Sequence, residues 1–378
     1  MLVSGNTGVG KTVFTKRLAV EMHNVYDANV LVFDWAQDYR SAINYIKDPA
    51  KYQLFTFNPS FMTTRINLIA PPKNVPKDVW SSTVAQLFCF AFGLGGRSLL
   101  IITDIMRSLI GSMPNPTIKD LAAKIEKEYE DRMVQSGNKM DFNEKATFSS
   151  MKDRFKLWLK EDSIVYQSMC ANGTFLNVED LIEGERFRVF ECSHLPEEVI
   201  PFVVNGLSAA IFHYCEHNRK VLRKPTYTFF EEAHTILQEP SGNEPLAIKE
   251  TIFEKINRIS RKYNLFTVYI CQNPEEMPPA LYNRIPVQMT LNIQSDEGRQ
   301  LFVASAGRDP IRKDRNLVDF ISRMPRGMVL IRQGIFDHSD MTKGELTAFM
   351  AAPLPMDTDY ISDDVFKSLY AKKVKAVR

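Results

Sequence analysis

The fold is decided by Gly5-Asn6-Thr7-Gly8-Val9-Gly10-Lys11-Thr12, a stretch that fits the phosphate-loop pattern G-x-x-x-x-G-K-[ST] at every defined position. A short apolar run, Leu2–Ser4, precedes it, and a segment with helical spacing, Val13–His23, follows it. Strand, glycine-rich loop and helix form the context that a phosphate loop requires. The sequence therefore predicts a nucleoside triphosphate site on an α/β sheet.

The residue types in this loop suit the binding of phosphate. Glycines let successive backbone N–H groups turn inward around the β-phosphate, and the helix N-terminus adds partial positive charge. Lys11 is expected to reach the β- and γ-phosphates, and the Thr12 hydroxyl to coordinate Mg²⁺. The alternative is a glycine turn without a ligand, which the flanking strand and helix disfavour. The expected ATP-binding residues are Gly5, Asn6, Thr7, Gly8, Val9, Gly10, Lys11 and Thr12.

A phosphate loop needs an acidic partner at the end of another strand. Two glutamates, Glu231 and Glu232, follow the apolar run Tyr227–Phe230. We assign Glu231 to the magnesium shell and Glu232 to polarising the attacking water, since a carboxylate beside the metal usually orients that nucleophile. The alternative is a solvated pair of glutamates at a strand end.

A third element is the apolar run Leu265–Cys271, which ends in Gln272. At the carboxyl end of a strand, its amide is placed to sense the γ-phosphate. The preceding basic stretch, Arg258–Lys262, contains candidates for an arginine finger that contacts the ATP of a neighbouring subunit, and we select Arg261. The alternative is a solvated helix end whose cations suit the helix dipole. The sequence leaves the choice between Arg258 and Arg261 open.

Strands alternate with helices at both ends of the chain, which predicts a mainly parallel sheet with helices on its faces. The middle has mostly helical periodicity. We expect a first part of the core in 1–74, a mostly helical insertion in 75–185, the rest of the core in 186–350, and a loosely ordered tail in 351–378. The predicted strands after the first are Val30–Asp34, Tyr52–Phe57, Phe187–Glu191, Tyr227–Phe230, Leu265–Cys271, Val287–Leu291 and Met328–Arg332. The predicted later helices are Val199–His217 and Pro245–Tyr263.

The composition is typical of a soluble globular protein. The 47 basic and 45 acidic residues nearly cancel, so any DNA contact must come from local patches or from assembly. Five dispersed cysteines without a CxxC grouping indicate a reducing, cytoplasmic compartment rather than a zinc site or a disulfide framework. No apolar run reaches the roughly 20 residues that span a bilayer. We therefore expect no transmembrane segment.

Other residues have a structural and a functional interpretation. Asp34–Tyr39 is expected either to contribute to the nucleotide pocket or a subunit contact, or to form a turn closed by Asp34. His234 is expected to be a packed or hydrogen-bonded histidine rather than a ligand. The first helix is expected to expose Lys16, Arg17 and Glu21. Three aromatic residues are expected in the core rather than in a base-stacking platform: Phe55, Phe57 and Phe61.

Together these motifs resemble the FtsK/HerA superfamily of ring-forming, RecA-like motor ATPases, and its HerA-like branch in particular. Asp34–Tyr39 resembles the family's D-x-x-x-[DE]-[FY], and Asn67-Leu68 stands in the place of its N-L segment. Glu231–His234 resembles D-E-A-H. Arg261–Tyr263 and Gln272–Pro274 look like the R-K-Y-G and Q-x-P segments. The resemblance extends over most of the chain.

The resemblance implies a hexameric, ATP-driven DNA translocase with a RecA-like core, in which Glu232 is the catalytic base, Gln272 the sensor and an arginine near 261 the finger. Two features depart from the family. Glu231 replaces an aspartate, which lengthens the metal-facing side chain by one methylene group. Met1 stands only four residues before the loop, whereas the relatives carry a small β-barrel first. We therefore expect either a trimmed chain or a member reduced to its motor.

The leading hypothesis is a DNA translocase that serves DNA end-processing with a nuclease, import or conjugation through a membrane channel protein, or genome packaging. It would act in the cytoplasm or at the membrane through a partner. The alternative is a secretion-type ATPase that remodels protein without DNA; a slow nucleotide-binding module is disfavoured by the paired glutamates. Candidate pore-lining groups, with solvated faces as the alternative, are Arg308, Arg312, Lys313 and Arg315, or Lys220, Arg223 and Lys224.

Overall fold

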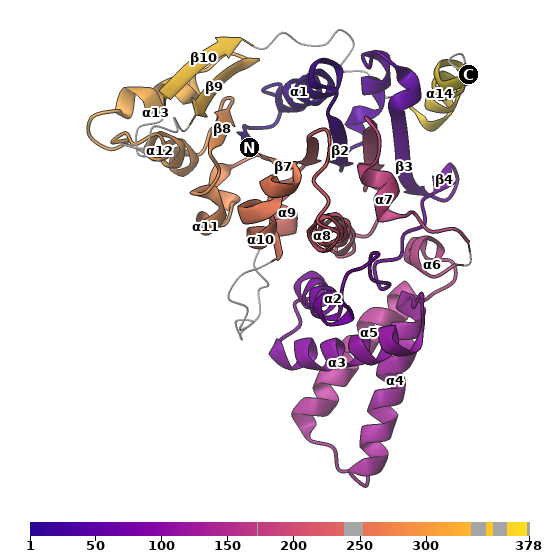
Figure 1. Ribbon diagram of the computed structural model, residues 1–378. Coiled ribbons are helices and arrows are strands. Elements are labelled where there is room, and N and C mark those ends of the chain that lie inside the picture. The colour runs from indigo at the N-terminus through magenta and orange to yellow at the C-terminus, as the bar shows by residue number, and fades with distance from the viewer. Residues whose placement is uncertain (172, 238–251, 334–344, 351–360, 376–378) are drawn as a thin grey trace.

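A mainly parallel sheet forms the centre of the molecule. A computed structural model describes residues 1–171, 173–237, 252–333, 345–350 and 361–375 (Figure 1). These contain a 10-stranded sheet in the order β10-β9-β8-β1-β7-β6-β2-β5-β3-β4. Pairing is parallel from β8 to β3 and antiparallel for β8–β9, β9–β10 and β3–β4. The predicted α/β fold with a RecA-like, mainly parallel sheet is confirmed. The strands are β1 (Leu2–Ser4), β2 (Asn29–Asp34), β3 (Tyr52–Asn58), β4 (Met62–Thr63), β5 (Phe187–Glu191), β6 (Thr226–Phe230), β7 (Leu265–Cys271), β8 (Val287–Thr290), β9 (Met328–Gln333) and β10 (Glu345–Met350).

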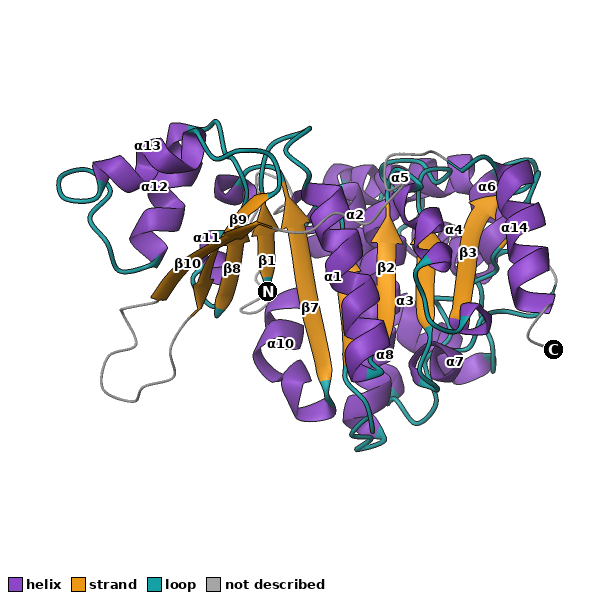
Figure 2. Ribbon diagram, turned by 90° about the horizontal axis from the view of Figure 1, so that it is seen from above, coloured by secondary structure: helices purple, strands orange, loops and turns teal. Residues whose placement is uncertain are grey.

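Helices cover both faces of the sheet, so its central strands are shielded from solvent on both sides. Every residue of β2 and β5 is buried. Along β2, Val32 belongs to a core that includes α1 (Lys11–Tyr26), whereas Phe33 belongs to a second core that includes α8 (Ile200–His217). This alternation follows from the two-residue period of a strand. Figure 2 shows the strands side by side, with α14 near β3 and with α12 and α13 near β10.

The helical middle of the chain extends away from the sheet (Figure 1). A cluster of aromatic rings anchors it to α8, because Phe202 lies 4.5 Å from Phe88 and 5.6 Å from Trp158 between ring centroids. Such pairs contribute about 1 kcal/mol beyond the area they bury. The division into a core and a helical insertion remains a prediction. The helices between β4 and β5 are α2 (Lys77–Phe92), α3 (Gly96–Ser112), α4 (Ile118–Gln135), α5 (Phe142–Trp158), α6 (Ile164–Met169) and α7 (Val178–Ile182).

The second half of the sheet is also accompanied by helices. Of the predicted helix 245–263, the first residues lie outside the described part; the rest is α10, which passes into a 3-10 turn, η3. No described helix is long and apolar enough to cross a membrane. The later helices are α9 (Ala233–Leu237), α10 (Ile252–Ile259), α11 (Pro279–Tyr282), α12 (Asp296–Ser305), α13 (Arg315–Ser322) and α14 (Asp363–Lys375), and the 3-10 turns are η1 (Asp38–Asn44), η2 (Pro49–Lys51), η3 (Ser260–Tyr263) and η4 (Pro274–Glu276).

The expectation of a loosely ordered tail is wrong for its described part. Residues 363–375 form α14, which packs beside β3. Phe366 is 1% exposed, and its ring lies 5.9 Å from that of Tyr52. Asp363 at the start of α14 forms an ion pair of 2.8 Å with the buried Arg40. Two aromatic side chains four residues apart, Phe366 and Tyr370, give the helix its apolar face.

The expectation that Lys16 faces solvent is also wrong. Its side chain is 2% exposed, and its ammonium donates a hydrogen bond of 3.0 Å to the Ser41 hydroxyl. The cause is η1, which packs over this face of α1 and turns an outward helical position into an interior one. Arg17 and Glu21 are half-exposed, as expected, and form an i,i+4 ion pair of 2.6 Å.

We expect Phe366→Ala to reduce the free energy of unfolding by about 3 kcal/mol, because it leaves a cavity under α14. Its neighbour Val365 is 58% exposed, so Val365→Ala provides the control and should change stability little. Urea denaturation of both variants measures the difference. Equal effects of the two substitutions would contradict the packing of α14 on β3.

Candidate nucleotide site

The phosphate loop leaves β1 at the carboxyl edge of the sheet, between the ends of β7 and β8. The Gly5 amide donates to the Gln272 carbonyl at 3.2 Å, and the Asn6 amide donates to the Asn292 carbonyl at 2.9 Å. A side chain at Gly5 would place its Cβ 2.9 Å from that of Leu291, so glycine is needed there. Gly10 precedes α1 with a φ of 97°, which only glycine adopts without strain.

The Lys11 side chain reaches from the start of α1 to the end of β7. The side chain is 9% exposed, and its Nζ donates to the Cys271 carbonyl at 3.2 Å. Burial lowers the pKa of Lys11, and the nearby Glu232 and Glu231 oppose this effect. The lysine is therefore held by a carbonyl group near two carboxylates, in a place where a triphosphate would provide further acceptors.

Glu231 and Glu232 follow β6, next to β7 in the sheet, and differ in environment. Glu231 is 7% exposed, and its Oε2 accepts a weak hydrogen bond of 3.4 Å from the Trp35 amide. Burial raises the pKa of Glu231 well above its usual value, and the nearby Asp34 and Asp38 raise it further. A buried carboxyl group among other acids is suited to bind a cation.

Glu232 has a left-handed backbone conformation, with a φ of 42°. This conformation is uncommon outside glycine and is often found at functional sites. The turn directs its carboxylate toward the tip of β7, where Oε1 accepts a hydrogen bond of 3.3 Å from the Gln272 amide nitrogen. The second oxygen, Oε2, lies 3.5 Å from Nδ1 of His234. One oxygen of Glu232 is thus fixed and the other borders a histidine.

Gln272 joins the loop to the acidic residues. Its Oε1 accepts from the Thr7 hydroxyl at 3.2 Å while its Nε2 donates to Glu232. Three elements that are distant in sequence, the phosphate loop and the ends of β6 and β7, are therefore linked by one amide. The structure brings together the loop, Glu231, Glu232 and Gln272, as the sequence predicted.

Arg261 lies elsewhere. It precedes β7, whose seven residues separate it from Gln272 by about 20 Å along the strand. Arg261 and Arg258 are both exposed. Neither is placed near the nucleotide loop of its own chain, so a finger role requires a neighbouring subunit.

The predicted basic groups partly pair with acids on the surface. Arg308 contacts Asp314 at 3.4 Å, and Lys220 contacts Glu183 at 2.8 Å. Further ion pairs join Arg315 to Asp296 and Lys224 to Asp27. These contacts are typical of solvated faces, the alternative given above.

The remaining expectations concern structure rather than chemistry. Asp34 closes the predicted turn, because Oδ1 accepts from the Ala36 amide at 3.0 Å and Oδ2 from the Tyr39 amide at 2.9 Å. His234 is half-buried, and its Nδ1 lies 3.5 Å from the carboxylates of Glu232 and Glu276; its structural role stays a prediction. Three aromatic side chains are packed in or against the core, as expected: Phe55, Phe57 and Phe61.

Arg326 lies beside the loop, although no motif in the sequence marks it as a site residue. The Gly327 amide donates to the Val9 carbonyl at 3.2 Å, and Arg326 lies so close that its Cγ would be 3.8 Å from a Cβ at Gly10. Arg326 is exposed at the rim of the loop. Only the antiparallel return of the chain into β9 brings this arginine to the loop.

The family described as "Helicase HerA, central domain" matches residues 1–211, which is more than half of the chain. The chain belongs to the HerA central-domain family. This confirms the resemblance to HerA-like P-loop ATPases that the motifs indicated. No curated protein matches the sequence.

Solved structures with the same fold include two proteins. VirB4 of Thermoanaerobacter pseudethanolicus has a TM-score of 0.66 at 14% identity, over 95% of this chain and 90% of that one. The bacterial conjugative coupling protein TrwB has a TM-score of 0.65 at 11% identity, over 93% and 84%. TrwB has also been solved with ADP and Mg²⁺, and that structure matches with a TM-score of 0.61 at 12% identity, over 93% and 85%. At these identities the similarity establishes the fold.

We expect Glu231→Gln to increase the free energy of unfolding of the nucleotide-free protein at pH 7 by about 1 kcal/mol or more, because it removes the cost of burying an acid beside Asp34. When folding raises the pKa of a carboxyl group, the folded protein becomes less stable as the pH rises from the pKa of the unfolded chain, near 4.5, through the pKa of the folded protein. The gain should therefore be larger at pH 8 than at pH 5.

Urea denaturation at both pH values measures this effect. The exposed Glu130 provides the control, since Glu130→Gln should have no such pH-dependent effect. A destabilised Glu231→Gln protein at pH 8 would contradict the assigned electrostatics.

Proposed function

We propose that this HerA-family chain is an ATP-hydrolysing, ring-forming DNA translocase. The observation that carries the proposal is the Gln272 amide, which bonds both Thr7 in the phosphate loop and the Glu232 carboxylate. This link supports the proposed roles of the two residues, because an amide and a carboxylate meet beside the loop that would hold the triphosphate. Such a site can report hydrolysis to the strand that carries Gln272.

Each residue has a role in this proposal. The loop amides and Lys11 bind the triphosphate, Glu232 orients and deprotonates the attacking water, and Gln272 responds to the γ-phosphate. The donor set fits Mg²⁺, because the Thr12 hydroxyl and the Glu231 carboxylate are hard oxygen ligands and the buried acids need a positive charge. Bound there, Mg²⁺ would neutralise charge on the phosphates.

Ring formation would complete the site. Arg261 cannot serve its own loop, so in the proposed homohexamer it serves the ATP of the next subunit as a finger. DNA would pass through the ring, and only part of each subunit would contact it, which fits a chain of 47 basic and 45 acidic residues. The division into a core, a helical insertion at 75–185 and a tail is part of this proposal.

Several DNA processes could use such a motor. The fold similarity to a conjugative coupling protein favours conjugation or import of DNA, with the ring in the cytoplasm beside a membrane channel protein. End-processing with a nuclease partner and genome packaging use the same core. A second candidate is a secretion-type ATPase that works on protein without DNA, because a fold alone does not distinguish these two functions.

Steady-state ATP hydrolysis with and without double-stranded and single-stranded DNA tests the proposed function. We expect DNA to increase the rate, and the increase to fade as salt rises, because contacts to phosphate release counterions. Rates that do not respond to either DNA in an assembled ring would contradict translocation and favour the secretion-type alternative.

We expect Glu232→Gln to bind ATP as the wild type does and to lower the hydrolysis rate by about 100-fold or more, because the amide cannot accept the proton of water. Nucleotide affinity by fluorescence titration and turnover by phosphate release separate the two effects. Glu276→Gln makes the same change of charge next to His234 and provides the control. Retained turnover in Glu232→Gln would show that another group is the base.

A further inference from the structure

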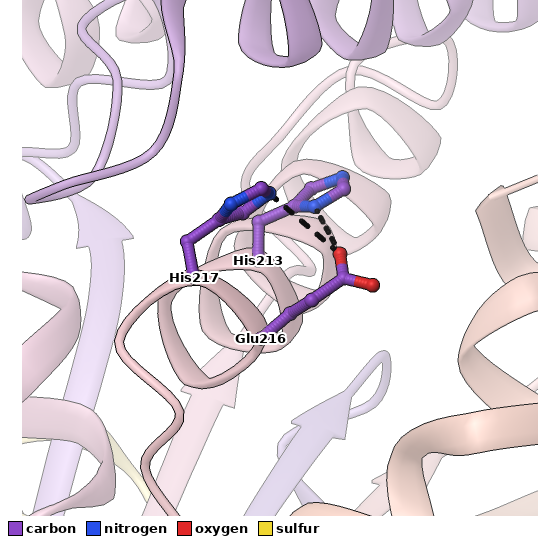
Figure 3. Close-up of side chains that lie close together, drawn as sticks. All are labelled: His213, Glu216 and His217. Atoms are coloured by element: carbon purple, nitrogen blue, oxygen red, sulfur yellow. Dashed lines mark hydrogen bonds and ion pairs between the residues drawn. The ribbon is translucent and has the colours of Figure 1, made fainter.

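Three potential metal ligands meet at the end of α8, far from the phosphate loop. His213, Glu216 and His217 present one donor atom each, and all three atoms lie within 4.8 Å of one another (Figure 3). Glu216 Oε2 lies 3.1 Å from His213 Nδ1 and 3.8 Å from His217 Nε2. Because α8 begins beyond the carboxyl end of β5 and ends before β6 starts, this cluster lies at the opposite edge of the sheet from the nucleotide.

The hydrogen bonds around His213 define its tautomer. Thr83 in α2 donates its single hydroxyl hydrogen to the Val79 carbonyl at 2.9 Å. Its oxygen also lies 3.1 Å from His213 Nε2, so it accepts there and Nε2 carries the hydrogen. In a neutral ring, Nδ1 then presents a lone pair to the Glu216 carboxylate. Two acceptors face each other at hydrogen-bonding distance.

This pair needs a positive charge between its atoms. The ring of His213 is 2% exposed and packs against Trp80 and Phe212, which hold it in place with Nδ1 facing the carboxylate. The ammonium of Lys255 on α10 lies 2.9 Å from the same Oε2 and offsets part of the carboxylate charge. A metal ion between Nδ1 and the carboxylate oxygen would satisfy both lone pairs.

We propose that His213 Nδ1, His217 Nε2 and the Glu216 carboxylate bind a divalent cation of the zinc type. Bonds of about 2.0 to 2.1 Å in a tetrahedral site separate neighbouring donors by about 3.3 Å, and the two measured separations, 3.1 and 3.8 Å, lie on either side of this value. Thr83 supplies the outer hydrogen bond that orients a metal-binding histidine. His217 and Glu216 are 25% and 22% exposed, which leaves access for the ion and for water as a fourth ligand.

Lys255 competes with the ion for Glu216. Its ammonium contacts Oε2 and lies over the ring of Phe212, 5.2 Å from the centroid. The metal ion and Lys255 would therefore bind the same carboxylate. Metal binding would break the ion pair that joins α8 to α10. Removal of the charge at Lys255 should strengthen metal binding.

Titration of the full chain with Zn²⁺, followed by calorimetry, and with Co²⁺, followed by visible absorption, tests this proposal. We expect one ion per chain with the spectrum of a nitrogen- and oxygen-ligated tetrahedral site. His217→Gln changes a partly exposed residue and should weaken binding at least tenfold with an unchanged circular dichroism spectrum. Lys255→Gln should strengthen it several-fold. His194→Gln, outside the cluster, provides the matched control and should bind as the wild type does.

Three results would overturn the proposal. One is the absence of a stoichiometric ion in the wild type, accompanied by a doubly protonated His213 ring in nitrogen NMR spectra. Another is an affinity that His217→Gln leaves unchanged. The third is a thiolate charge-transfer band for Co²⁺, which would place the ion at a cysteine.

Thr83→Val is a second variant, and we expect it to weaken binding without the loss of a ligand.

Discussion

The pairing of the three-residue strand β1 between β7 and β8 is the constraint on which the site depends. Val3 lies opposite Ile270 on one side and Met289 on the other. This pairing fixes where the chain leaves the sheet, and therefore where the phosphate loop meets Gln272. The ends of β6 and β7 adjoin because these strands are neighbours, so a carboxylate and an amide converge on a loop more than 220 residues away in sequence.

The same edge of the sheet concentrates negative charge in the interior. Asp34 and Glu231 are both nearly inaccessible, and burial raises the pKa of Asp34 to about 6. Such a cluster opposes folding and persists only where surrounding structure compensates or where a ligand cation is bound. Asp34 is partly compensated by amides of its own turn, whereas Glu231 receives one long hydrogen bond. Glu231 is accordingly the residue whose energetics would change most when a metal–nucleotide complex binds.

Sequence patterns predicted the parts of this molecule that depend on local spacing. The loop, the strand ends and the residues Glu231, Glu232 and Gln272 followed from motifs and from the rule that parallel strands present their carboxyl ends together. The burial of Lys16 could not be predicted in this way, because helical periodicity does not show that a distant 3-10 turn covers a polar position. Arg326 reaches the loop only because β9 pairs antiparallel with its neighbour. The helix α14 packs on the sheet through the contact of Phe366 with Tyr52, which is distant in sequence. Contacts of this kind arise from tertiary packing, which no local pattern contains.

A crystal structure of the chain with Mg²⁺ and a non-hydrolysable ATP analogue tests the central claim most directly. The account predicts the β-phosphate inside residues 5–12, Mg²⁺ between Thr12 and Glu231, and the Gln272 amide turned from Glu232 toward the γ-phosphate. A nucleotide bound away from the loop, or a γ-phosphate that neither Glu232 nor Gln272 approaches, would contradict it.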